Sequence, residues 1–178
     1  LNISSFIEVN GKVSPITNDI KNNIKRIAKE LNIQGLRVVA VCKKYDIDKI
    51  KTFKVSDESK MILTGFIGFL DPPKESAKEA IKKLNDAGIR VIVLTGDNAE
   101  VTKCVCKKVN INTSKIIVGN QVDKMSDIAL RRIMKRVNVF AKLSPIQKAR
   151  IVRLLKEEGN TVGYMGDGIN DSPSLTNS

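Results

Sequence analysis

Three polar clusters in the sequence carry residue types suited to binding a phosphate group and a divalent cation. They are residues 95–98 (Thr-Gly-Asp-Asn), Lys148, and residues 166–171 (Gly-Asp-Gly-Ile-Asn-Asp). A hydroxyl group, backbone amides at the start of a helix and a lysine ammonium all attract phosphoryl oxygens. Two carboxylates in a glycine-rich turn are ligands suited to Mg²⁺, which shares its coordination shell with phosphate. The clusters therefore indicate phosphoryl-transfer chemistry.

Each cluster taken alone also has an ordinary structural explanation. Residues 95–98 could form a tight turn between a strand and a helix, with Asp97 or Asn98 as the N-cap. Lys148 could be a solvated helix residue, and residues 166–171 could form a polar turn. A calcium loop of the EF-hand type is excluded because no further acidic residue lies at the required spacing. The order of the three clusters along the chain is more specific than any one of them.

The elements predicted around these clusters alternate between strand and helix. The predicted strands are Met61–Leu70, Arg90–Leu94, Ile116–Val118, Val139–Ala141 and Thr161–Met165, and the predicted helices are Glu75–Ala87, Ala99–Val109, one capped by Ser126, and Pro145–Glu158. This alternation predicts an α/β fold with a Rossmann-like parallel sheet and helices on both faces. Ligands bind such sheets at the carboxyl ends of the strands. All three clusters follow predicted strands.

The first 56 residues have a different pattern, which predicts strand, strand, helix and strand. Asn10-Gly11 is a hairpin signal between two short strands, and a helix capped near Thr17 follows. Leu36–Cys42 is predicted as a buried strand, and the polar stretch Tyr45–Lys60 as a loop or linker. We therefore predict a partial α+β domain over residues 1–56, followed by the α/β domain over residues 57–178.

The composition argues against several other classes of protein. The net charge is +12, but the lysines are interleaved with apolar residues at helical spacing, and aromatic residues make up only 4% with no Trp. Stacking platforms for nucleic acid are thus missing, and we predict no nucleic-acid partner. Three cysteines without any His argue against a disulfide framework and against a zinc site. The apolar runs are too short to cross a bilayer.

Four segments resemble the phosphorylation domain of P-type ATPases, within the haloacid dehalogenase superfamily. They are residues 71–73 (Asp-Pro-Pro), 95–98, 140–148 and 166–173. Residues 34–45, 57–74 and 161–175 are most similar to bacterial magnesium-transporting members. The resemblance implies that residues 1–56 are the end of a nucleotide-binding domain. It also implies that residues 57–178 are a phosphorylation domain without its first strand, which carries the phosphorylated aspartate.

The resemblance implies roles for the first two clusters. Thr95 and Gly96 would hold the phosphoryl group, and Asp97 would support this loop and the nucleotide. Lys148 would neutralise the charge of the aspartyl phosphate.

The resemblance also implies a metal site and a nucleotide site. Asp167 would ligate the catalytic Mg²⁺, while Asn170 and Asp171 would support the phosphate, with Asp171 also near the metal. Arg37 would reach the phosphates of ATP, and Asp71 would lie near the hinge between the two domains. The implied cofactors are Mg²⁺ and ATP, the latter as substrate.

The family's phosphorylated motif, Asp-Lys-Thr-Gly-Thr, is absent from the 178 residues. We expect it upstream of Leu1, together with the membrane helices and the actuator domain. The intact protein is then expected to be an ATP-driven cation transporter of a bacterial plasma membrane, with magnesium as cargo and an aspartyl-phosphate intermediate. This chain would be its cytoplasmic portion, with ATP, the transported cation and the rest of the polypeptide as partners. Without the nucleophile, the chain alone is expected to be inactive.

Two other functions remain open from the sequence. Asp46 and Asp48 form an Asp-x-Asp pair after a predicted strand, which is how free-standing phosphatases of this superfamily place their nucleophile and acid. However, Lys43, Lys44 and Tyr45 separate this pair from the apolar run. The other alternative is a non-catalytic module that binds acidic partners through its positive charge.

Overall fold

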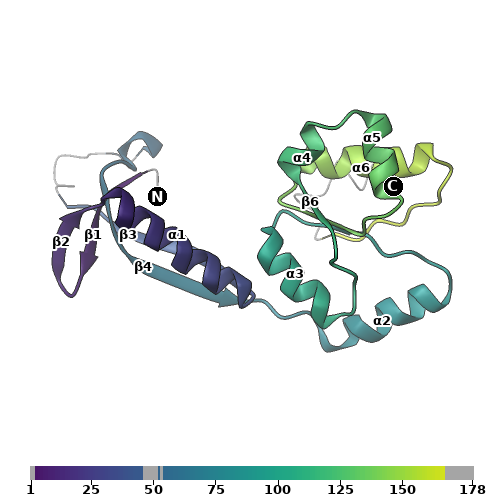
Figure 1. Ribbon diagram of the computed structural model, residues 1–178, viewed down its shortest axis with the longest axis horizontal. Helices are drawn as coiled ribbons and strands as arrows, with labels where there is room; N and C mark the ends of the chain where they lie inside the picture. The colour runs from purple at the N-terminus through teal and green to yellow at the C-terminus, as the bar shows by residue number, and fades with distance from the viewer. Residues whose placement is uncertain (1–2, 46–51, 53, 167–178) are drawn as a thin grey trace. The chain divides into compact units, whose positions relative to one another are not determined.

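The computed structural model describes residues 3–45, 52 and 54–166. The chain forms two compact units, Leu1–Asp71 and Pro72–Ser178 (Figure 1). The two units divide between Asp71 and Pro72, whereas the predicted domains divide between residues 56 and 57. The assignment of residues 1–56 and 57–178 to two domains of the family stays a prediction.

The first unit is a four-stranded sheet with one long helix. Its elements are β1 (Ser4–Val9), β2 (Lys12–Pro15), α1 (Asn18–Ile33), β3 (Leu36–Lys43), a 3-10 turn (Val55–Asp57) and β4 (Met61–Leu70). The strand order is β2-β1-β4-β3. β1 pairs antiparallel with β2 and parallel with β4, and β3 pairs antiparallel with β4. Asn10 and Gly11 both have positive φ angles, 51° and 75°, as the predicted hairpin turn requires.

Helix α1 begins and ends at the residues that the sequence predicts. The Thr17 hydroxyl oxygen accepts a hydrogen bond from the Ile20 amide at 3.3 Å. At the other end, Gly35 has φ 88°, a left-handed conformation that glycine adopts without strain. The helix buries Ile24 and contacts β3.

We predicted from its apolar run that strand β3 would be buried. In the structure, only one of its two faces is covered. Exposure alternates over its first half: Leu36 and Val38 are half-buried, while Arg37 and Val39 are exposed, and Val41 on the same face as Val39 is exposed as well. The physical reason is that α1 contacts this sheet and no second helix of the described residues in the unit covers the opposite face. The strand therefore has one covered face and one open face.

Strand β4 was predicted in the parallel sheet of the second block, and this placement is wrong. It pairs with β1 and β3, and its residues Ile62 and Leu63 are buried in the first unit. A long apolar strand is recognisable from its residues, but its partner strands are not. The polar stretch before β4 suggested a crossing between domains, whereas the chain returns to the same sheet.

The second unit has a parallel sheet with helices around it, which confirms the predicted fold class. Its elements are α2 (Glu75–Asp86), β5 (Val93–Leu94), α3 (Ala99–Lys108), β6 (Ile116–Val118), α4 (Gly119–Asp123), α5 (Asp127–Met134), β7 (Val139–Ala141) and α6 (Pro145–Glu157). The strand order is β5-β7-β6, all parallel. Figure 1 shows α4, α5 and α6 grouped together, with α3 on the other side of the sheet.

The core of this unit lies around the central strand β7. Phe140 in that strand is fully buried, and it packs in one cluster with Val122 of α4, Leu130 of α5, and Ile151 and Leu154 of α6. The side chains of three helices thus meet on one face of the short sheet. This packing fixes the start of α6 relative to the ends of β5 and β7.

The strand predicted at Thr161–Met165 is absent from the described structure, where residues 160–166 have no regular element. A strand needs a neighbouring strand to satisfy its backbone hydrogen bonds. Among the described residues, β5 is the end of the three-stranded order, which does not include residues 161–165. Met165 is 98% exposed as a result.

Candidate functional site

The turn after β5 is closed by its own side chains. The Asp97 amide donates to the Thr95 hydroxyl oxygen at 3.1 Å, and this hydroxyl lies 3.3 Å from the Asp97 carboxylate, to which it donates. The Asn98 side chain caps α3 by accepting from the Val101 amide at 2.9 Å. Asn98 is therefore the helix cap, and Thr95 and Asp97 shape the turn itself.

This turn is hydrogen-bonded to the loop that follows the central strand. The Thr95 amide donates to the Phe140 carbonyl at 3.0 Å, as a continuation of the pairing of β5 with β7. The Lys142 amide donates to the Asp97 carbonyl at 2.7 Å, and the Leu143 amide donates to the Thr95 carbonyl at 3.0 Å. Lys142 has φ 54°, the left-handed region. The two loops thus form one connected backbone structure.

Helix α6 begins directly after this loop with a capping box. The Ser144 hydroxyl oxygen accepts from the Gln147 amide at 3.3 Å, and the Gln147 side-chain oxygen accepts from the Ser144 amide at 2.9 Å. Pro145 occupies the first helical turn, as predicted. The Lys148 amide donates to the Ser144 carbonyl at 3.1 Å, and Lys148 is half-buried.

The structure therefore joins two of the three predicted clusters. Thr95, Gly96 and Asp97 lie on one loop, and Lys148 lies in the first turn of the helix that begins at the neighbouring loop. The amide ends of α3 and α6 and the lysine ammonium contribute positive charge to this region, and the Asp97 carboxylate contributes one negative charge. Such an arrangement suits an anion with several oxygens, such as a phosphoryl group.

The other predicted residues lie elsewhere in the chain. Arg37 is exposed on β3 of the first unit, directly opposite Phe69 of β4, and Asp71 is exposed immediately after β4. Asp167, Asn170 and Asp171 lie outside the described residues, as do Asp46 and Asp48. Their predicted roles remain predictions.

The part of the chain that the structure describes has neither a metal-binding cluster nor a membrane-spanning helix. It has no group of three or more His, Cys, Asp or Glu side chains that could hold a metal ion. None of its helices combines the length and the apolar character that crossing a membrane needs.

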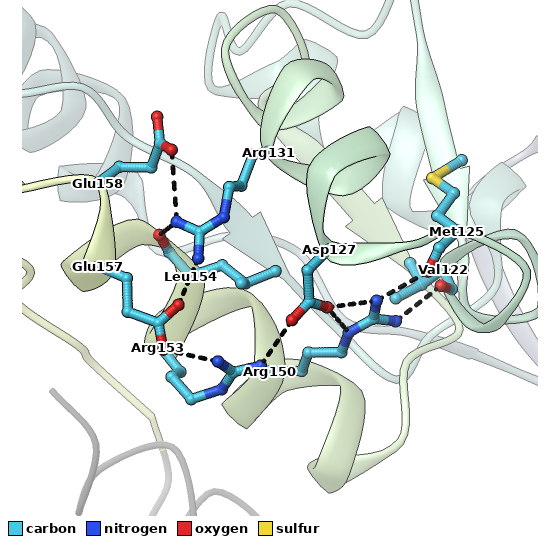
Figure 2. A network of polar contacts seen from close by, with 9 residues as sticks. All are labelled: Val122, Met125, Asp127, Arg131, Arg150, Arg153, Leu154, Glu157 and Glu158. Atoms are coloured by element: carbon cyan, nitrogen blue, oxygen red, sulfur yellow. Dashed lines mark hydrogen bonds and ion pairs between the residues drawn. The ribbon is translucent and has the colours of Figure 1, made fainter.

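A network of ion pairs joins α5 to α6, and it was not predicted from the sequence (Figure 2). The Asp127 carboxylate accepts from Arg150 at 2.6 and 2.9 Å and from Arg153 at 3.1 Å. Arg150 also donates to the carbonyls of Val122 at 2.9 Å and Met125 at 2.7 Å. This guanidinium thus binds two backbone carbonyls around the end of α4 as well as the carboxylate, and the Val122 carbonyl also accepts from the Met125 amide at 3.2 Å. No sequence pattern predicts this network, because it depends on how α4, α5 and α6 pack together.

A second group of carboxylates lies at the end of α6. Arg131 of α5 pairs with Glu157 and Glu158, and Arg153 also pairs with Glu157. Hydrogen bonds from Arg150 and then Arg153 lower the pKa of Asp127, and those from Arg153 lower the pKa of Glu157. Both carboxylates are therefore more acidic in the folded chain than in the unfolded chain.

Acid should weaken this network, and Asp127→Asn should reduce that effect. Because the folded pKa of Asp127 is lowered from 3.8, its contribution to stability is present above about pH 3.8 and is lost as the pH falls through the folded pKa. The Tm of the wild-type chain should therefore fall as the pH drops below about 3.8, more steeply than that of D127N. Thermal unfolding followed by circular dichroism measures this, with Asp86→Asn on α2 as control. Equal slopes for wild type and D127N would contradict the assignment.

Comparison with known proteins gives matches along the whole chain. Residues 40–178 match the haloacid dehalogenase-like hydrolase family, and residues 1–76 match the P-type ATPase cytoplasmic domain N. The chain is 45% identical over 175 residues to magnesium-transporting ATPase, P-type 1 of Escherichia coli (strain K12), with 98% of this chain and 20% of that protein covered. It is 34% identical over 169 residues to calcium-transporting ATPase 1 of Bacillus cereus, with 93% and 19% covered. The chain thus spans about a fifth of the length of these relatives.

Proposed function

Because the chain belongs to the haloacid dehalogenase-like hydrolases, which its residues 40–178 match, we propose that it is the cytoplasmic catalytic part of an ATP-driven cation transporter. The predicted resemblance to P-type ATPases is confirmed by the domain N match and by the relatives. The observation that carries the proposal is similarity over 98% of the chain to a magnesium-transporting ATPase. On this basis the transported ion is Mg²⁺, and the intact protein lies in a bacterial plasma membrane.

The proposed reaction is transfer of the γ-phosphoryl group of ATP to an aspartate carboxylate, followed by hydrolysis. The attacking carboxylate oxygen forms a bond to the γ-phosphorus, and the bond to the bridging oxygen breaks so that ADP leaves with the electron pair. The carboxylate belongs to the motif that the 178 residues do not contain, and we place it in another part of the same polypeptide. The chain alone should therefore not form a phosphoenzyme.

Within this reaction, Thr95, Gly96 and Lys148 would bind the phosphoryl group. The Thr95 hydroxyl now donates to Asp97 over 3.3 Å, a long hydrogen bond that it can exchange for one to a phosphoryl oxygen at small cost. The Gly96 amide would be a second donor, and the Lys148 ammonium would offset the negative charge. Asp97 would keep the turn closed through its amide, which donates to the Thr95 hydroxyl oxygen.

The oxygen ligands for Mg²⁺ would come from Asp167 and Asp171, with Asn170 beside them. Asp97, the carboxylate of the described turn, already accepts from Thr95, and the residues that the structure covers contain no group of three or more His, Cys, Asp or Glu side chains that could hold a metal ion. Carboxylate oxygens fit Mg²⁺ by donor type. When bound, the ion supplies positive charge that offsets the charge of the transferring group.

The open face of the first unit offers a surface for the nucleotide. Arg37 and Phe69 are directly paired across β3 and β4, as are Val39 and Ile67. Phe69 is 52% exposed, and the two aliphatic side chains are each 49% exposed. A flat apolar surface beside a guanidinium can stack a base and bind a phosphate. We assign the nucleotide site to this face, with Asp71 at the end of β4 near it in sequence.

Replacing Arg37 by alanine in the full-length protein should weaken ATP binding about tenfold or more, because a charged hydrogen bond is worth about 1.5–3 kcal/mol. Isothermal titration with ATP measures the Kd. Arg26→Ala is the matched control, since Arg26 is an exposed arginine on α1 that pairs with Glu30. Unchanged affinity in R37A would remove Arg37 from the nucleotide site.

The function as a whole is tested by incubating the full-length protein with labelled ATP and Mg²⁺. We expect an acid-stable, hydroxylamine-sensitive phosphoenzyme, and Mg²⁺ flux when the protein is placed in vesicles. Phosphoenzyme formation with a different transported ion would keep the mechanism and change the cargo. Hydrolysis of p-nitrophenyl phosphate by the 178-residue chain alone would instead favour the free-standing phosphatase.

A further inference from the structure

The side chain of Gln147 connects two helices next to the proposed phosphate site. Its nitrogen donates to the Gly119 carbonyl at 3.1 Å and to the Asp123 carboxylate at 2.7 Å, both on α4. Its oxygen accepts from the Ser144 amide at 2.9 Å, which is half of the capping box of α6. One half-buried amide group thus caps α6 and links it to α4.

Gly119 leaves no room for any other residue at this contact. It is buried, and a Cβ atom added there would lie 2.4 Å from the Lys142 carbonyl oxygen and 2.6 Å from the Gln147 side-chain oxygen. Both distances are shorter than real Cβ contacts, so a substitution would have to move the backbone or the glutamine. The start of α4, the loop at Lys142 and the Gln147 side chain are therefore packed directly against one another.

The same loop holds the Thr95–Asp97 turn through two hydrogen bonds. Lys142 and Leu143 donate their amides to the carbonyls of Asp97 and Thr95. A continuous path of contacts consequently runs from α4 through Gln147 and residues 142–144 to the turn. Lys148, the residue after Gln147, lies in the same first turn of α6.

We infer that Gln147 is a positioning residue, which uses its bridge to α4 to hold the start of α6, with Lys148, and the Thr95–Asp97 turn in the arrangement needed for phosphoryl transfer. This inference rests on the proposed function for its catalytic consequence. The bridge itself does not depend on that function and has its own readout.

A simple helix cap is the alternative role for Gln147, and one substitution separates the two. Gln147→Glu keeps the oxygen that accepts from Ser144, because glutamate serves in a capping box as well as glutamine does. It removes the nitrogen donor and places a carboxylate against the Gly119 carbonyl and the Asp123 carboxylate, all of which are acceptors. The cap survives in this variant, and the bridge is lost.

Gln121 provides a matched control. It is exposed on α4, and its side-chain oxygen accepts from the Val118 amide at 3.0 Å in the same kind of cap. Gln121→Glu makes the same chemical change at the cap of α4 and leaves the bridge from Gln147 to Gly119 and Asp123 in place.

The experiment compares wild type, Q147E and Q121E in the full-length protein by amide hydrogen exchange of peptides that cover residues 140–144. We expect exchange at Lys142 and Leu143 to become about tenfold faster or more in Q147E, since loss of the partly buried hydrogen bond to Gly119 allows more frequent local opening. Q121E should match wild type. If Q147E does not fold, Gln147→Met removes the bridge and one half of the cap without adding charge. Ser144→Ala, which removes the other half of the cap and keeps the bridge, is then its control.

The second readout is phosphoenzyme formation from ATP. At saturating ATP, Q147E should be phosphorylated about tenfold more slowly or worse, with its KM for ATP within about twofold of wild type. Wild-type exchange in Q147E overturns the inference, and so does faster exchange with an unchanged phosphorylation rate. If wild type forms no phosphoenzyme, the proposed function fails, and exchange alone then decides whether Gln147 holds the turn.

Discussion

Replacing Phe140 by alanine is expected to destabilise the second unit by about 3–5 kcal/mol, the usual cost of removing a buried phenylalanine. Phe140 lies in the central strand β7, is fully buried, and packs with the side chains of α5 and α6. Its removal leaves a cavity that a short, three-stranded sheet cannot fill by collapse without moving its helices. Urea unfolding of the chain, followed by circular dichroism, measures the change in the free energy of unfolding.

The matched control is Ile146→Ala, because Ile146 lies on α6 and is 79% exposed. It should change stability by less than about 0.5 kcal/mol. The Phe140 carbonyl also accepts from the Thr95 amide, so F140A should loosen the proposed phosphate site as well as the core. A loss below about 1 kcal/mol in F140A would mean that the core does not centre on β7.

Replacing Asp167 by asparagine in the full-length protein should reduce Mg²⁺-dependent phosphorylation by ATP about a hundredfold or more. The change removes a charged ligand from the proposed metal site, and metal stabilisation of the transferring charge is worth several kcal/mol. The measurement is the amount and rate of phosphoenzyme as a function of Mg²⁺ concentration.

Asp86→Asn is the control for this variant. Asp86 is an exposed carboxylate of the same unit that pairs with Lys82 on α2, so its loss should leave phosphorylation unchanged. Normal phosphoenzyme levels in D167N would exclude Asp167 as a ligand of the catalytic ion. Because Asp167 lies outside the described residues, this prediction depends on the sequence pattern alone.

Local sequence signals predicted most individual elements. The hairpin at Asn10-Gly11, the N-caps at Thr17 and Ser126, and the start of α6 at Pro145 all depend on neighbouring residues, and each is present in the structure. The alternation of strands and helices likewise predicted the parallel sheet of the second unit. These features need only short-range information, which a single sequence contains.

The pairing of strands was less accessible to sequence reasoning. Met61–Leu70 is a strand as predicted, but it pairs in the first sheet, and residues 161–165 form no strand among the described residues. Strand pairing is a property of two segments that are distant in sequence. An apolar run predicts that a strand can form, and it says nothing about which neighbour will pair with it.

In the candidate site, too, the features set by neighbouring residues were predicted, and the contacts between distant segments were not. The Thr95–Asp97 turn and the helical position of Lys148 were predicted, whereas Gln147 and Arg150 were missed. The Ser-x-x-Gln spacing from Ser144 to Gln147 is a capping-box signal that could have drawn attention to Gln147. Its bridge to α4 could not have been predicted, because Gly119 is 28 residues away in sequence.

The position of β3 at the end of the sheet order has a practical consequence for handling the chain in solution. In the described structure β3 pairs with β4 on one side, and its segment from Val38 to Cys42 contains neither charge nor proline. Such an edge is a template for intermolecular β-pairing and amyloid-like aggregation. Arg37 and Lys43 flank the segment, and Lys43 is paired with Glu8. Arg37 therefore acts as the main gatekeeper, since bringing two copies together places like charges close to each other. The chain should consequently remain dispersed at low ionic strength and aggregate more readily as salt screens these charges.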